Sequence, residues 1–254
     1  MSEGFDRGGA RPSYPAFRAP GVLVGLVALL FGIHLARGFL SGEADFQLIL
    51  TFALFPARYA PTVDGAVYSF PGGLWADLWT PVTYAFLHAD WLHLIFNSVW
   101  LMAFGTPVAR RLGAVRFILF YLLCGVIAGV AYAGAQAGSL APVVGASGAI
   151  SGVIAGAALF VFERSGPLAR FGFDYSAEAL RAVPRRPAHK ALAGGQALVF
   201  SAVWLGLTLL TGLIGLGAAG ESANIAWEAH VAGFIAGILF FPRFDPVRAL
   251  KLFG

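Results

Sequence analysis

Two side chains that could form a nucleophile–base pair, Ser147 and His230, lie in otherwise apolar stretches of this sequence. Ser147 belongs to the tetrapeptide Gly145–Gly148, and His230 is followed three and seven residues later by Gly233 and Gly237. A serine hydroxyl becomes an effective nucleophile when a neighbouring base removes its proton. Each signal also has a simpler explanation, because a serine between glycines suits close packing and a buried histidine can be a hydrogen-bonded core residue. Catalysis therefore requires a fold that brings the two residues together.

A second polar pair, His93 and Asn97, is four residues apart and so shares one face of a helix. Two neutral donors aimed at one point could stabilise a developing oxyanion. The alternative is a hydrogen bond between helices, worth about 0.6–2 kcal/mol.

Other chemistries are weaker in this sequence. His88, Asp90 and His93 lack the H-E-x-x-H spacing of a zinc helix, so we expect no metal. We expect no cofactor. Glu228 stands two residues before His230, and residues at that spacing do not face each other on a helix, so it is not expected to complete a triad.

The composition indicates lipid as the solvent, with 58% apolar and 12% charged residues. Soluble domains have about 25% charged residues. Disorder is excluded by the high hydrophobicity, and a disulfide scaffold by a single cysteine. The net charge of +4 fits basic membrane-flanking loops better than a nucleic-acid partner, which we do not expect.

Six segments approach the length of about 20 apolar residues that a membrane crossing needs. The sequence therefore predicts an all-α membrane protein, with spans at Gly21–Leu40, Leu92–Val108, Ala114–Ala135, Gly148–Phe162, Gly194–Leu216 and Ala223–Phe241. The fourth is short and is expected to start inside the membrane or to thin the bilayer.

The basic residues orient these spans. With six crossings, all but two of the 17 Lys and Arg residues fall on one side, the exceptions being Arg37 and Arg58. The positive-inside rule places that side in the cytoplasm. We therefore expect a membrane domain at 21–241 between cytoplasmic tails at 1–20 and 242–254.

The first outer loop, Ser41–Leu87, is long and apolar. Its segment Phe46–Pro56 is too short to span and is expected to be interfacial or re-entrant. Aromatic residues typical of the headgroup region follow: Trp75, Trp79, Tyr84 and Trp91. The inner segment Glu163–Leu192 is expected to be a solvated connector.

Glycines mark two faces for close helix packing. Gly148, Gly152 and Gly156 recur every four residues in the fourth span, and Gly233 and Gly237 do so in the sixth. Small residues at this spacing let helices approach closely. We expect these two spans to pack together and to bring Ser147 near His230 towards the outer leaflet.

Taken together, these motifs resemble those of the rhomboid family of intramembrane serine proteases. The matching elements are H-x4-H-x3-N ending at Asn97, G-x-S-G around Ser147 and A-H-x2-G-x3-G around His230. They occur in the family's order on the second, fourth and sixth spans, and the similarity runs from about Trp79 to Phe241. The resemblance implies a six-helix bundle whose first outer loop is partly embedded in the membrane.

The resemblance also implies roles for individual residues. Ser147 and His230 would form a catalytic dyad without an acidic third member, and His93, Asn97 and the Ser147 N–H would bind the oxyanion.

The remaining motif residues have supporting roles by the same resemblance. His88 would lie near the mouth of the site, while Gly145, Ala146 and Gly148 would leave room for the substrate backbone or support the site. The substrates would be transmembrane proteins in the lipid bilayer, and the expected location is the inner membrane of a bacterium. The sequence does not indicate the oligomeric state.

Three positions depart from the family pattern. Thr80 replaces a loop arginine, Ala109 replaces a glutamate after the second span, and Ser151 replaces a tyrosine four residues after the serine. The first two affect structural support and the third affects the support of the His230 ring. Two other readings stay open: a non-catalytic rhomboid-like protein that binds membrane clients, and a transporter or channel.

Overall fold

The computed structural model describes residues 19–60, 65–213 and 226–247. This part of the chain is mostly helical and contains no strand, and an isolated antiparallel bridge joins Leu54 to Val143. Most of the predicted tails (1–18 and 248–254), the end of the fifth predicted span and the start of the sixth lie outside the described residues.

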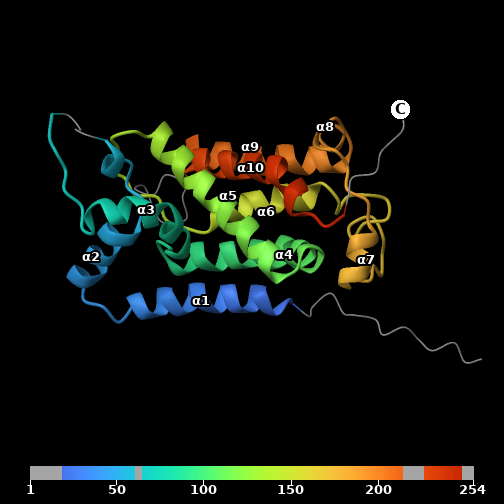
Figure 1. Cartoon of the computed structure of the whole chain (residues 1–254), viewed down its shortest axis with the longest axis horizontal. Coiled ribbons are helices and arrows are strands. Elements are labelled where there is room, and N and C mark those ends of the chain that lie inside the picture. Colours follow the sequence, from blue (N-terminus) through green and yellow to red (C-terminus); the bar gives the residue numbers. More distant parts are fainter. Residues whose placement is uncertain (1–18, 61–64, 214–225, 248–254) are drawn as a thin grey trace, which may run out of the picture.

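Six helices overlap the predicted segments, and α5 crosses the others at an angle (Figure 1). They are α1 Gly21–Arg37, α4 Trp91–Leu112, α5 Ala114–Ala135, α6 Ser147–Ala158, α9 Gln196–Leu213 and α10 Trp227–Phe244. Among the described helices, only α4 and α5 are long and apolar enough to cross a membrane by length and composition, while α1, α6 and α9 are apolar but shorter.

Helix α6 forms the centre of the bundle, since every residue from Gly148 to Ala158 is buried. It packs against α4, α5 and α10. A Cβ atom added at Gly233 would collide with the carbonyl of Gly148, and one added at Gly237 with the carbonyl of Gly152. Glycine at these positions therefore lets the backbones of α6 and α10 approach more closely than any side chain would permit.

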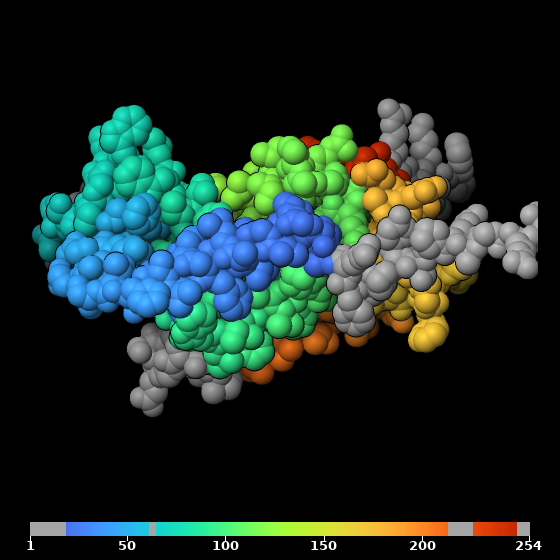
Figure 2. All heavy atoms as spheres, turned by 90° about the horizontal axis from the view of Figure 1, so that it is seen from below, coloured from blue at the N-terminus to red at the C-terminus, as the bar shows by residue number. Residues whose placement is uncertain are grey.

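Helix α1 lies on the outside of the bundle against α4 (Figure 2). Its buried face consists of Leu23, Leu26 and Leu30. Helix α9 contacts α4 through aromatic pairs, Trp100 with Trp204 and Phe104 with Phe200.

The predicted outer loop folds into short helices, at the left of Figure 1. They are α2 Gly42–Phe52, η1 Pro56–Tyr59, α3 Gly73–Thr83 and η2 Tyr84–Phe86. Thr83 donates a hydrogen bond to the carbonyl of Phe52 at 2.7 Å, and the Trp79 indole to that of Thr51 at 3.1 Å. These bonds tie α3 to the end of α2.

The two arginines that the charge count left on the outer side both bond to this loop, Arg58 from within it and Arg37 from the end of α1. The Arg58 side chain is 3% exposed and donates to the carbonyls of Leu50 and Pro71. Arg37 pairs with Asp45 at 2.7 Å and donates to the carbonyl of His88 at 2.7 Å. Their role is therefore to hold loop backbone in place.

At the opposite end, the segment Glu163–Leu192 is more than a solvated connector. It contains α7 Ala177–Ala182 and α8 Ala188–Ala191, and it buries Leu180 and Val183. It folds back on the end of α6, where the Arg186 N–H donates to the carbonyl of Leu159 at 3.0 Å.

This end, which we call the base, is organised around the fully buried Arg111 of α4. Its guanidinium pairs with both carboxylate oxygens of Asp245 at 2.9 and 3.0 Å and donates to the carbonyls of Leu180 and Val183. Arg185 also pairs with Asp245 at 3.1 Å. The helix α10 runs to Phe244, beyond the predicted end at Phe241, and Asp245 joins it to this network.

Candidate active site

The side chains of Ser147 and His230 meet where α6 and α10 begin. Ser147 is the first residue of α6, and His230 lies in the first turn of α10. The Ser147 Oγ and His230 Nε2 atoms are 2.6 Å apart, which is hydrogen-bonding distance. Both residues are only partly buried. The arrangement can transfer the serine proton to the imidazole, the first step of nucleophilic catalysis.

Gly145 permits the backbone turn that precedes Ser147. Its φ angle of +119° lies in a region that disfavours side chains, and an added Cβ would lie 2.7 Å from the ring of His93 and 3.6 Å from Nδ2 of Asn97. The backbone of this turn therefore passes directly over the two predicted oxyanion donors. Ala146 is buried beside it, and an added Cβ at Gly148 would lie 2.6 Å from Ala128.

Asn97 lies beside the turn that precedes Ser147. Asn97 is buried, and its Nδ2 has no hydrogen-bond partner among the described residues. Ser147 opens α6, and the first N–H groups of a helix lack partners within it. Backbone N–H groups at a helix start, together with an amide side chain, suit a developing negative charge.

Asp90 fixes the start of α4 just before these donors. Its carboxylate accepts the N–H of His93 at 2.8 Å as a helix cap. The ring of His88 stacks edge-on against that of His93 with centroids 5.1 Å apart. Burial, together with the nearby His93, lowers the pKa of His88 to about 3, so this ring is neutral at neutral pH.

Tyr84 positions the site, a role that the sequence prediction of a headgroup residue missed. It is 1% exposed, its hydroxyl donates to the carbonyl of Gly125 at 2.7 Å, and its own carbonyl accepts the N–H of Gly145 at 3.0 Å. An added Cβ at Gly129 would lie 2.7 Å from its ring. The small residues of α5 could have indicated this role, because they predict that another segment packs closely against that helix face.

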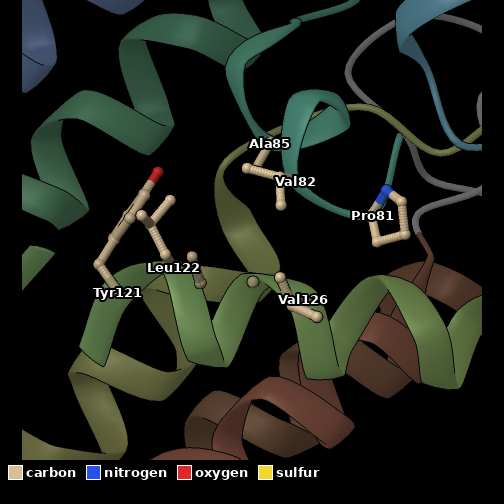
Figure 3. A pocket seen from close by; sticks show the side chains of 8 residues that line it. Pro81, Val82, Ala85, Tyr121, Leu122 and Val126 are labelled. Atoms are coloured by element: carbon tan, nitrogen blue, oxygen red, sulfur yellow. The ribbon is translucent and has the colours of Figure 1, made fainter. Parts of the chain in front are cut away.

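An apolar recess is lined by the end of α3, by η2 and by residues of α5 and α6 (Figure 3). The residues lining it are Pro81, Val82, Ala85, Tyr121, Leu122, Gly125, Val126 and Ala149. None of the predicted catalytic side chains belongs to it.

Within the described residues, no carboxylate is hydrogen-bonded to the far side of the His230 ring. Its Nδ1 atom is buried without a hydrogen-bond partner among the described residues. Glu228 instead accepts a hydrogen bond from Gln136 at the end of α5. Ser151 is fully buried one turn below Ser147, and its hydroxyl is also unpaired within the described part of the chain.

Two of the positions that depart from the family pattern, Thr80 and Ala109, have defined surroundings in this structure. Thr80 shares a 2.7 Å hydrogen bond with the hydroxyl of Tyr59, and Arg58 supplies the guanidinium of the loop from a different point in the sequence. Ala109 is buried near the end of α4, where Arg111 two residues later carries the polar network. The described residues contain no group of three or more potential metal ligands.

The fold and the site define a helical membrane protein with a serine–histidine pair at the start of two packed helices. The Rhomboid domain profile matches residues 76–242, which is more than half of the chain. The chain therefore belongs to the rhomboid family, whose members are integral membrane proteins.

Curated relatives support this assignment. The chain is 42% identical to the rhomboid protease GluP of Bacillus subtilis over 89 residues, or 35% of this chain and 16% of GluP. It is 37% identical to the putative rhomboid protease YdcA of the same organism over 92 residues, covering 36% of this chain and 44% of YdcA. It is 23% identical to the rhomboid protease GlpG of Pectobacterium atrosepticum over 196 residues, covering 77% of this chain and 54% of GlpG. The chain thus spans about half or less of these relatives.

Proposed function

We propose that this protein is an intramembrane serine protease that hydrolyses peptide bonds in or near the transmembrane segments of membrane proteins. The observation that carries the proposal is the 2.6 Å contact between Ser147 Oγ and His230 Nε2 at the start of α6. The names of the similar relatives, several of them rhomboid proteases, support the same activity.

The proposed reaction uses the dyad twice. Ser147 Oγ attacks the peptide carbonyl while its proton passes to His230 Nε2, and that proton then goes to the leaving amine as the C–N bond breaks. The acyl group remains on Ser147 as an ester. A water molecule, deprotonated by His230, hydrolyses the ester and restores the free hydroxyl. The scheme requires no cofactor.

The proposed oxyanion donors are Asn97, His93 and the backbone N–H of Ser147. Support comes from the unpaired amide of Asn97 and from Gly145, which brings the turn against both side chains. Removing a single donor of this kind typically costs 10²–10³ in turnover.

The proposed topology has six crossings, with both termini in the cytoplasm of a bacterium and the site towards the outer face of its inner membrane. The distribution of Lys and Arg supports it, because only Arg37 and Arg58 fall on the outer side. The first outer loop would be partly embedded in the membrane. Its helix α3 supports this by exposing Leu74, Trp75 and Leu78 to the surroundings.

The proposed partners are transmembrane protein substrates and the bilayer itself. A peptide bond in a helix is hydrogen-bonded and shielded, so the substrate must unwind locally before attack. Helix-breaking residues such as glycine lower that cost by about 1 kcal/mol each.

The test is cleavage of a fluorogenic transmembrane substrate by the purified full chain in detergent. We expect cleavage by the parent protein and by a Ser201→Ala control, and none by Ser147→Ala. Cleavage that persists in Ser147→Ala would exclude this nucleophile. A parent protein that cleaves none of several substrates would instead favour a non-catalytic protein that binds membrane clients.

A further inference from the structure

Ser151 of α6 carries a buried hydroxyl that makes no hydrogen bond within the described structure. Serines and threonines inside helices commonly donate to the carbonyl four residues earlier. Ser98, Thr106 and Thr211 do so here, at distances between 2.6 and 2.8 Å. Ser151 does not use the carbonyl of Ser147 in this way. An unpaired buried hydroxyl destabilises the folded protein by about 1–3 kcal/mol, so we expect this hydroxyl to have a hydrogen-bond partner.

The Nδ1 atom of His230 also lacks a hydrogen-bond partner in the described structure. Its Nε2 faces Ser147 Oγ at 2.6 Å and must accept the serine proton in the proposed reaction. A neutral imidazole carries one hydrogen, so Nδ1 must then hold it and act as a donor. This donor is buried without an acceptor in the described residues. The partner of one ring nitrogen decides which tautomer a histidine adopts.

The packing of α6 on α10 places the two groups in one short stretch. An added Cβ at Gly148 would lie 3.6 Å from the carbonyl of Ala229, and one at Gly152 would lie 3.0 Å from the carbonyl of Gly233. Because the contacts advance together along both helices, α6 and α10 run side by side in the same direction. Ser151 and His230 both lie between these two contacts.

Among the described residues, the other polar groups around the His230 ring do not accept a hydrogen bond from Nδ1. Glu228, on the same helix as His230, is bonded to Gln136. His93, from α4, is a second imidazole and carries no negative charge. Cys124, from α5, contacts the neighbouring Gly152 and is a weak acceptor.

We propose that the Ser151 hydroxyl accepts the Nδ1 hydrogen of His230, either by rotation about its Cα–Cβ bond or through one buried water. Ser151 is then a positioning residue that holds the imidazole with Nε2 free to act as the base. A single buried water typically makes about three hydrogen bonds to otherwise unpaired groups, so it can connect the two. The inference rests on the proposed protease function.

The first test is kinetic. Ser151→Ala removes only the hydroxyl, and we expect kcat to fall at least tenfold with KM unchanged. Correctly positioned acid–base catalysis contributes about 10²–10⁴-fold, so the loss of orientation forfeits part of that factor. Ser151→Thr, which keeps a hydroxyl, should recover part of the activity. The matched control is Ser201→Ala in α9, another buried serine with an unpaired hydroxyl, and its kcat should stay within twofold of the parent value.

The second test does not depend on cleavage. In protein labelled with ¹⁵N-histidine, the His230 signals, identified by their loss in His230→Ala, should show a protonated Nδ1 with a slowly exchanging hydrogen. Ser151→Ala should remove that protection and Ser201→Ala should not. Unchanged His230 signals in Ser151→Ala would overturn the inference. If the parent protein cleaves the substrate, a Ser151→Ala variant with the same kcat would also overturn it. A parent that cleaves nothing would overturn the proposed function, while the NMR result would still decide the role of Ser151.

Discussion

The base of the bundle satisfies its buried charges, whereas the site end leaves several buried polar atoms unpaired. At the base, Arg111 bonds to Asp245 and to two backbone carbonyls and lies over the ring of Phe160. At the site end, unpaired atoms occur on His88, Asn97, Ser151 and His230.

This difference separates stability from function. Buried polar groups in folded proteins are nearly always paired, so a cluster of exceptions marks a place where substrate, water or a reacting group completes the bonding. A paired network such as the base instead resists any loss of a partner. The account therefore predicts that substitutions at the two ends change different measured quantities.

The largest effect is expected at the dyad. His230→Ala removes the base that activates Ser147, and we expect kcat to fall by about 10⁴ or more, as in other serine hydrolases that lose the histidine. The unfolding midpoint should change less than in variants of the base, because within the described structure the ring makes one side-chain hydrogen bond, to Ser147, whereas Arg111 makes several. A fluorogenic cleavage assay measures kcat, and thermal unfolding in detergent measures stability. A fall in stability without a fall in kcat would contradict a catalytic role for His230.

At the base, Arg111→Met should act on stability first. It leaves the Asp245 carboxylate with Arg185 and the N–H of Val247 as partners, and it removes the donors to two buried carbonyls. Breaking a buried ion pair from one side costs about 3–5 kcal/mol. The matched control is Arg116→Met, because Arg116 is exposed. Equal unfolding free energies for the two variants in a denaturant titration would contradict a structural role for the base.

Asn97→Ala, at the site end, should also lower activity more than stability. It removes one proposed oxyanion donor, so we expect a fall in kcat of about 10²–10³ with KM nearly unchanged. Its amide Nδ2 has no partner to lose, and stability should stay near the parent value. If Asn97 serves only to hold helices together, the unfolding midpoint will fall and kcat will not.

The smallest effect is expected from the loop pair of Arg37 and Asp45. The hydrogen bond from Arg37 lowers the pKa of the Asp45 carboxyl, so the pair stabilises the fold above the ordinary pKa of an aspartate and loses this contribution as the pH falls through the lowered value. Because Asp45 is partly exposed, the contribution is at most about 1 kcal/mol. Asp45→Asn should be less stable than the parent at pH 7, and the difference should shrink below about pH 4. A difference that is constant over this range would exclude the pair as its cause.

The features that local spacing encodes could be predicted from the sequence. Glycines at every fourth position describe one helix face, so the close approach of α6 and α10 follows from the positions of Gly152 and Gly233. Apolar length predicted the approximate course of the six apolar helices, although α6 ends at Ala158 rather than Phe162.

Long-range pairing could not be read in the same way. Arg111 and Asp245 are far apart in the sequence, and a run of basic residues beside a span looks like an ordinary cytoplasmic loop. Arg58 likewise bonds to the loop carbonyls of Leu50 and Pro71, which no motif marked. Polar groups that bond backbone carbonyls leave no periodic signal, because any folded loop can offer a carbonyl.

The most direct measurement of the central claim is covalent labelling by a fluorophosphonate probe, with the modified residue located by mass spectrometry. The account predicts one adduct, on Ser147, in the parent protein, and its loss in His230→Ala. An adduct on another serine, or labelling of Ser147 that persists without His230, would contradict the dyad.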